Sequence, residues 1–273
     1  MAPSPTIDPS KVRPAAVAGR FYPSDPVELR KVITDLLASV PPAIGLAPKA
    51  LIAPHAGYLY SGPIAASAYA QLIPARDQIK RIVLFGPSHY VALRGLATTS
   101  AAAFATPLGI VPVDAEAVRE ARSLTQVREL DQAHAQEHSL EVQLPFLQCV
   151  LADFTLLPLA VGDATPEEIS QVLEALWGGP ETRFVISSDL SHYHDFQTAQ
   201  RLDRATAKAI EALKPGRIGE EGACGRMPIR GLLQSARRHG LRARAVDLRN
   251  SGDTAGPRDK VVGYGAFVFE EVQ

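Results

Sequence analysis

Residues 50–55 read Ala-Leu-Ile-Ala-Pro-His, a short apolar run that ends in a proline and a histidine. Two further stretches have the same form: residues 82–89 read Ile-Val-Leu-Phe-Gly-Pro-Ser-His, and residues 184–192 read Phe-Val-Ile-Ser-Ser-Asp-Leu-Ser-His. Short apolar runs bounded by turn residues are typical of buried strands in a parallel sheet. Because ligands of such sheets bind beyond the carboxyl ends of the strands, the three histidines meet at one edge if the strands are neighbours.

The composition is that of an ordinary globular protein. The 273 residues are 46% hydrophobic and 21% charged, which is enough for a sizeable core. A formal net charge of −1 gives no long-range field that would attract nucleic acid or an anionic membrane. Residues 1–14 lack the apolar stretch of a secretory signal, and no apolar run is long enough to span a membrane. Two cysteines suggest no disulfide framework, so we expect a cytoplasmic protein with reduced thiols.

Helix and strand signals alternate along the chain, which predicts an α/β fold. Asp25-Pro26-Val27-Glu28 and Thr165-Pro166-Glu167-Glu168 both have the sequence of a helix start, and an apolar face follows each. Further helices are expected at about 63–72, 114–123, 139–151, 197–213 and 228–239, and further strands at about 154–161, 242–249 and 261–270. We predict one domain over residues 1–273, a three-layer αβα sandwich with a mostly parallel or mixed central sheet, in which residues 1–12 form a flexible tail.

Two strand-end histidines and one cysteine have the chemistry of metal ligands. Small residues and prolines around His55 and His89 predict tight turns that hold each imidazole, and neutral imidazole binds Fe, Zn, Cu and Ni. Cys224 lies in a glycine-rich loop ahead of a predicted helix N-terminus, which favours the thiolate. We therefore expect His55, His89 and Cys224 to bind a metal, although a cysteine of this kind is also common as a buried apolar residue. Cys149, in an apolar helical stretch, is expected in the core.

Asp189 and His192 lie three residues apart after the third apolar run. A carboxylate next to an imidazole can orient the ring and raise its basicity, so His192 is a candidate acid/base group and Asp189 a candidate to orient it. The residues alone leave two alternatives open. Asp189 would serve equally well as the cap of a turn, and His192 as a metal ligand.

Residues 134–138 read His-Ala-Gln-Glu-His and match the H-x-x-E-H pattern of one class of zinc peptidases. That pattern needs both histidines on one face of a regular helix, whereas this segment precedes the expected helix start. It is therefore a weak signal, and the roles of His134 and of Asp253, which lies in a turn-like segment, stay open. Three further residues are candidate members of the pocket: Tyr58, His138 and Glu141.

Seven segments, in order from about residue 13 to about residue 269, resemble the corresponding segments of the Memo family. These segments are Ala18–Pro23, Pro54–Tyr58, Gly86–His89, Glu137–Phe146, Ser188–Tyr193, Cys224–Gly225 and Val262–Tyr264. Each is short, but together they are specific. The resemblance implies a fold like that of the class III extradiol dioxygenases of the LigB type, with a mixed sheet between helical layers.

In those dioxygenases two histidines and one glutamate bind Fe(II), and a further histidine acts as acid/base. The resemblance implies that His55 and His89 are ligands, that His192 is the acid/base residue, and that Cys224 replaces the carboxylate. A thiolate is softer than a carboxylate, so Zn or Cu would compete with iron. Bacterial and archaeal relatives are linked to AMMECR-type and radical-SAM proteins, which implies such proteins as partners.

These observations lead to one first hypothesis and two alternatives. The first hypothesis is a mononuclear non-haem Fe(II) protein that carries out an O₂-dependent or other redox reaction on a small molecule. The second is a non-catalytic protein that binds a metal or a peptide with a degenerate dioxygenase site. The third is a zinc hydrolase in the same pocket, since two histidines and one cysteine form a known catalytic zinc set.

Overall fold

The computed structural model describes residues 7–43 and 45–271 of the chain. Its main element is a nine-stranded sheet with the order β10-β12-β2-β9-β3-β8-β4-β7, in which β11 also pairs with β12. The strands are β2 (Ala50–Ala53), β3 (Arg81–Pro87), β4 (Leu96–Thr98), β7 (Val127–Glu129), β8 (Thr155–Val161), β9 (Thr182–Ser187), β10 (His192–His194), β11 (Leu241–Asn250) and β12 (Val261–Glu271). Both parallel and antiparallel pairs occur, so the predicted mixed α/β sheet is confirmed.

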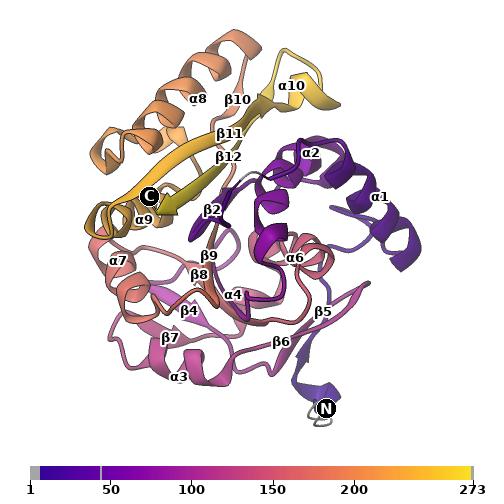
Figure 1. Ribbon diagram of the computed structural model, residues 1–273, viewed down its shortest axis with the longest axis vertical. Helices are drawn as coiled ribbons and strands as arrows, with labels where there is room; N and C mark the ends of the chain where they lie inside the picture. The colour runs from indigo at the N-terminus through magenta and orange to yellow at the C-terminus, as the bar shows by residue number, and fades with distance from the viewer. Residues whose placement is uncertain (1–6, 44, 272–273) are drawn as a thin grey trace.

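Helices cover both faces of the sheet, as Figure 1 shows. They are α1 (Pro26–Ala38), α2 (Tyr58–Tyr69), α3 (Ala115–Arg122), α4 (Gln132–Ala135), α5 (His138–Glu141), α6 (Leu144–Val150), α7 (Pro166–Ala175), α8 (Phe196–Glu211), α9 (Arg226–Arg238) and α10 (Ser251–Thr254). One apolar cluster joins α1, α2 and α6 to one face, and a second joins α3, α7, α8 and α9 to the other. The three-layer sandwich is therefore confirmed.

The sheet alternates cleanly between these two cores. In β2, Leu51 belongs to the first cluster and Ile52 to the second; in β3, Leu84 and Phe85 divide in the same way. Successive side chains of a strand point to opposite faces, so a strand covered by helices on both sides is apolar throughout. This is why the runs quoted above are continuous rather than alternating.

The predicted helix starts are confirmed where a capping residue marks them. The Asp25 carboxylate accepts hydrogen bonds from two N–H groups of α1, and Thr165 forms a full capping box with Glu168 at the start of α7. The expected helix at 139–151 is instead two short helices, α5 and α6. Pro145 lies in the first turn of α6, where its missing N–H costs no helical hydrogen bond.

The N-terminal segment is part of the fold from residue 8 onward. Pro9–Lys11 form a 3-10 turn, and β1 (Val12–Arg13) begins a small sheet with β5 (Ala103–Thr106) and β6 (Gly109–Pro112). The tail predicted over residues 1–12 therefore includes residues 9–12, which have regular structure. Residues 1–6 lie outside the described residues. Among the described residues, no helix is long and apolar enough to cross a membrane.

Candidate metal centre

The strands that carry His55 and His89 do run side by side. Strand β9 lies between β2 and β3, and all three are parallel, so their carboxyl ends meet at one edge of the sheet. His55 follows β2, His89 follows β3, and Ser187 ends β9 between them. The histidine ring centroids are 5.2 Å apart and nearly perpendicular. The predicted convergence at this edge is thus present for two of the three histidines.

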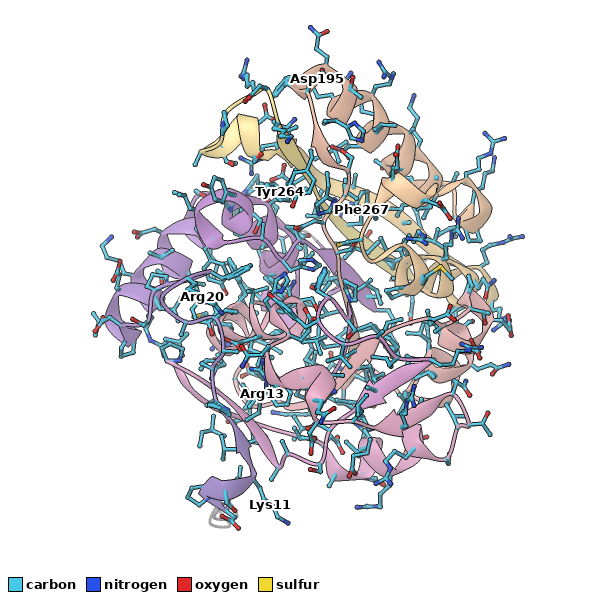
Figure 2. All side chains as sticks on the ribbon, turned by 180° about the vertical axis from the view of Figure 1, so that it is seen from behind. Lys11, Arg13, Arg20, Asp195, Tyr264 and Phe267 are labelled. Carbon is cyan, nitrogen blue, oxygen red and sulfur yellow. The ribbon has the colours of Figure 1, made fainter. Side chains whose placement is uncertain are left out.

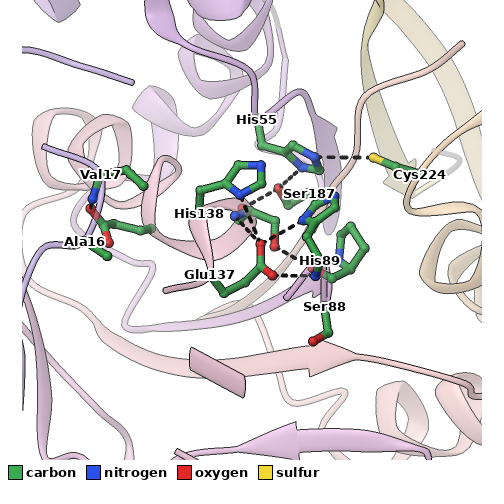
Figure 3. Close-up of polar contacts among 12 residues, drawn as sticks. Ala16, Val17, His55, Ser88, His89, Glu137, His138, Ser187 and Cys224 are labelled. Carbon is green, nitrogen blue, oxygen red and sulfur yellow. Dashed lines mark hydrogen bonds and ion pairs between the residues drawn. The ribbon is translucent and has the colours of Figure 1, made fainter. Parts of the chain in front are cut away.

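A third imidazole, that of His138, completes the group. One side-chain nitrogen from each of His55, His89 and His138 lies within 4.8 Å of the other two, which is a spacing that could hold a metal ion. His138 begins the short helix α5, and its ring stacks on that of His89 with centroids 4.6 Å apart. Figure 3 shows the three rings facing one another, with Cys224 beyond His55.

Hydrogen bonds fix the tautomer of His55. Nε2 of Gln143 donates both to the carbonyl of Pro54 (3.0 Å) and to Oγ of Ser187 (2.8 Å). The hydroxyl of Ser187 donates its one hydrogen bond to the carbonyl of Ser139 (2.5 Å). Its remaining contact is with Nδ1 of His55 at 2.9 Å, so Nδ1 must be the donor. Nε2 of His55 is left with a free lone pair, which is the form that binds metals.

Glu137 holds His89 in the same way. One carboxylate oxygen lies 2.8 Å from Nδ1 of His89, and the other accepts the backbone N–H of His89 at 2.6 Å. Burial works against ionisation of Glu137, but the hydrogen bonds from His89 lower its pKa to about 2, so it is a carboxylate at neutral pH. The carboxylate therefore accepts the Nδ1 proton of His89 in a hydrogen bond and leaves Nε2 outside that bond, an arrangement common behind metal-binding histidines.

Burial keeps two of the three imidazoles, those of His55 and His138, neutral. Burial, followed by the nearby charge of His89, lowers the pKa of His55 to about 3, and burial with the charge of His55 lowers that of His138 to about 4. Among the described residues, Nδ1 of His138 is a buried nitrogen without a hydrogen-bond partner. Its closest charged atom is Oε1 of Glu137 at 3.4 Å. Neutral imidazoles with free lone pairs fit a divalent transition metal.

Cys224 lies beside this group. Its Sγ is 3.3 Å from Nε2 of His55, and it accepts the backbone N–H of Asp189 at 3.3 Å. Burial raises the pKa of the thiol to about 12, so the sulfur is protonated without a metal. In the described structure, His138 occupies the place in the three-residue group that was expected for Cys224. Coordination by Cys224 therefore stays a prediction.

Asp189 and His192 are arranged differently from the expectation. The Asp189 carboxylate accepts the backbone N–H of His55 at 2.8 Å, and its hydrogen bonds among the described residues include none to His192. Asp189 thus fixes the turn after β2. His192 begins β10. In the sheet, β10 pairs with β12, so that β12 and β2 lie between β10 and β9. Burial raises the pKa of Asp189 and lowers that of His55, and His192 makes a smaller contribution to each.

Glu141, expected in the pocket, is a structural anchor instead. Its Oε2 accepts hydrogen bonds from the guanidinium of Arg13 and from the N–H of Ala16. Its Oε1 accepts from the N–H of Val17 and from the hydroxyl of Tyr22 at 2.6 Å. Both oxygens are therefore used to hold the N-terminal segment, and Figure 3 shows Ala16 and Val17 away from the histidines. Figure 2 shows Lys11 at the outer end of this segment and Arg13 further in.

Three other singled-out residues also have structural contacts. The Tyr58 hydroxyl donates to the carbonyl of Val142 at 2.6 Å, so Tyr58 belongs to the packing of α2 rather than to the pocket. His134 lies in α4, apart from His138 in α5, and its Nε2 is 3.1 Å from the carbonyl of Ala97. The helical face that the peptidase pattern needs is therefore missing. Asp253 closes a capping box in α10.

Sequence reasoning missed Glu137, Ser187 and Gln143, which hold the two imidazoles. The signal for Ser187 was present, because it is the residue at which β9 ends, whereas the expectation fell on His192 further along. Glu137 adjoins His138 within one of the Memo-like segments. Its role depends on the start of α5, where its side chain also accepts the N–H of Ser139, and no local pattern gives that position.

Comparisons with known proteins show which family the chain resembles. The Memo family, described as "Memo-like protein", matches residues 13–268. A MEMO1 family protein of Aquifex aeolicus is 35% identical over 95% of this chain and 99% of its own length. A MEMO1 family protein of Aeropyrum pernix is 36% identical, over 94% of this chain and 99% of its own length. One of Methanosarcina barkeri is 35% identical, over 95% and 100%. The chain therefore belongs to the Memo family.

Proposed function

We propose that the chain is a metalloprotein with a mononuclear non-haem iron site at the carboxyl edge of β2 and β3, and that it carries out redox chemistry on a small molecule. The observation that supports this most is the state of two imidazoles. His55 is neutral, and both rings are held at Nδ1, by Ser187 and by Glu137, so that each Nε2 lies outside these hydrogen bonds, beside a third histidine. Ferrous iron bound there would supply a Lewis acid and a one-electron donor.

The ligands of this proposal are His55, His89 and either Cys224 or His138. Sγ of Cys224 is 3.3 Å from Nε2 of His55, so a metal would displace the thiol proton between them. His138 offers a nitrogen that needs no deprotonation. The two choices predict different metals: three imidazoles suit Fe(II) or Zn, whereas a thiolate makes Cu(I) and Zn more competitive.

His192 is the proposed acid/base residue. It is partly exposed at the start of β10, whereas His55 is buried and His89 is held by Glu137. Asp189 acts on this site through the backbone of His55 and through the N–H that it donates to Cys224. We therefore expect His192→Gln to keep the bound metal and lose turnover, and Asp189→Asn to weaken metal binding.

The experiment is elemental analysis of anaerobically purified protein. We expect about one iron per chain in the wild type and a loss of most of it in His55→Ala. His239→Ala is the control, because His239 lies at the end of α9 and pairs with Glu174. Cys224→Ser and His138→Gln, measured side by side, identify the third ligand. Iron that survives in a His55→Ala/His89→Ala double variant contradicts the proposal.

The same measurement separates the alternatives. Zinc in place of iron, with O₂-independent ester or phosphoester hydrolysis, favours the hydrolase. Metal without any turnover, combined with tight binding to an AMMECR-type protein, favours the non-catalytic binding protein. Partnership with AMMECR-type and radical-SAM proteins is itself a proposal, and pull-down with each purified partner tests it.

A further inference from the structure

A second site lies at the opposite edge of the central sheet. A cavity of about 800 Å³ opens where β2 and β9 begin, whereas the histidine group lies where they end. Strand β9 separates the two by about 16 Å, since a strand rises roughly 3.3 Å per residue. Residues that line the cavity include Lys49, Gln78, Trp177, Arg183, Arg244 and Glu270. The volume is within the range of roughly 300–1,000 Å³ typical of small-molecule sites.

Two buried cations form the floor of this cavity. Lys49 directly precedes β2, and its ammonium donates to the carbonyls of Trp177 (2.5 Å), Gly179 (3.0 Å) and Thr182 (3.1 Å). Burial, followed by the charge of Arg183, lowers the pKa of Lys49 to about 8. The ammonium is therefore still charged at neutral pH, and its protons are held by carbonyls rather than by a carboxylate.

Arg183 has unused donors beside Lys49. The residue is 7% exposed, and its Nη1 donates to the carbonyls of Pro180 (2.8 Å) and Thr182 (2.9 Å). Its Nε is a buried nitrogen with no hydrogen-bond partner among the described residues. Within residues 7–43 and 45–271, neither Arg183 nor Lys49 lies within 4.0 Å of a carboxylate in an ion pair. Buried charges are normally paired, so within the described residues this floor lacks its counter-ion.

The rim of the cavity carries one further arginine and two glutamates. Nη2 of Arg244 lies 2.9 Å from Oε1 of Glu270, so these two charges pair with each other and leave Lys49 and Arg183 uncovered. Glu271 at the rim and Glu181 act on Lys49 and Arg183 only through space. The guanidinium of Arg183 has the planar fork that binds carboxylate and phosphate oxygens in pairs.

We propose that this cavity is a binding site for a small organic anion with a carboxylate or phosphate group. Its oxygens bind Nη2 of Arg183, which makes no hydrogen bond within the described residues and, unlike Nε, is not fully buried. The site is separate from the metal centre and does not depend on the function proposed for it. Lys49 adds a positive charge on the buried side of the cavity, and Arg244 lines its outer side. The ligand is larger than an inorganic ion, because the cavity exceeds the volume that phosphate alone would fill.

The single tryptophan of the chain reports on this site directly, because Trp177 lines the cavity. We would titrate the purified protein with citrate, adenosine monophosphate and inorganic phosphate, and with adenosine as the uncharged control. A saturable change in tryptophan fluorescence with an anion, and none with adenosine, supports the proposal. Tighter binding of citrate or of the nucleotide identifies which oxyanion the site prefers, whereas equal binding of inorganic phosphate contradicts the proposal of an organic ligand.

Two variants make the test specific. Arg183→Met should weaken binding about tenfold or more, because a charge-assisted hydrogen bond and a cation are lost. Arg94→Gln is the matched control, since Arg94 is an exposed arginine that pairs with Glu168 elsewhere on the surface. If Arg183→Met does not fold, Arg244→Gln serves the same purpose. No saturable response to any anion, or equal affinity in wild type and Arg183→Met, overturns the proposal.

Discussion

Arg13 and Arg183 are equally buried, and each is 7% exposed, but the two regions treat the charge differently. The guanidinium of Arg13 pairs with the Glu141 carboxylate and also donates to the carbonyls of His134 (2.7 Å) and Glu137 (2.9 Å). Arg183 reaches carbonyls only, and its Nε has no partner in the described part of the chain. Arg13 therefore stabilises the fold through its pairing, whereas Arg183 keeps donors that the proposed anion would use.

Arg13 also braces the metal centre from behind. The carbonyls that it holds belong to the segment that carries Glu137 and His138, and Glu141 at the end of that segment completes the pairing. The N-terminal segment is thereby fixed to the turn that positions two of the site side chains. The histidine edge of the sheet is stabilised by paired charges, whereas at the opposite edge Lys49 and Arg183 form no ion pair within the described residues.

Breaking the Arg13 pair should have the largest effect. We expect Arg13→Met to lower the free energy of unfolding by about 3–5 kcal/mol, because Glu141 is left buried without its counter-charge. Urea unfolding measures this loss. The double variant Arg13→Met/Glu141→Gln should recover part of it, since both charges are then gone. A single variant within about 1 kcal/mol of wild type would contradict the assigned role of the pair.

Acid should lower the free energy of unfolding, because three buried histidines are neutral in the folded protein. The pKa values of His55, His134 and His138 are lowered to about 3, 4 and 4, mainly by burial, from an ordinary value near 6.5. Unfolding therefore takes up protons below pH 6.5. The contribution of these histidines to the free energy of unfolding is complete above that pH and is lost as the pH falls toward 4. Three such groups give a slope of about 4 kcal/mol per pH unit near pH 5.

Urea unfolding of metal-free protein at pH 7, 6 and 5 measures this slope. His134→Gln should reduce it by about one third without changing metal content, because His134 is outside the metal group. The Glu137 carboxylate, with a pKa lowered to about 2, adds its own loss only below its ordinary value near 4.5. A slope near zero between pH 6 and 5 would mean that the histidines are not buried neutral groups.

Two glutamates four residues apart sharpen the comparison within one region. Glu137 serves the site and Glu141 serves the scaffold, although both are buried. We expect Glu137→Gln to lower metal affinity by about 10–100-fold, because the hydrogen bond that orients His89 loses its charge. Glu141→Gln should lower stability and leave the affinity unchanged. Competition with a chromophoric chelator gives both affinities, and equal losses in the two variants would remove the distinction.

The same residues show how much of the structure can be predicted from the sequence. The apolar runs before His55 and His89 predict both strands and their meeting edge, because burial on two faces leaves a continuous apolar signature. The Arg13–Glu141 pair joins residues 128 positions apart and leaves no local pattern. The cavity is invisible for the same reason, since Lys49 and Arg183 become neighbours only through the pairing of β2 with β9.

The smallest effect is expected at Arg183, in the absence of an anion. Arg183→Met should change the free energy of unfolding by only about 1 kcal/mol, because the lost carbonyl contacts are offset by removal of an unpaired buried charge. Saturation with the anion that binds best, at a hundredfold excess over its Kd, should stabilise the wild type by about 2.7 kcal/mol and the variant far less. Thermal unfolding with and without the anion measures both. If Arg183→Met is as destabilising as Arg13→Met, Arg183 is a scaffold residue and the contrast between the two regions is wrong.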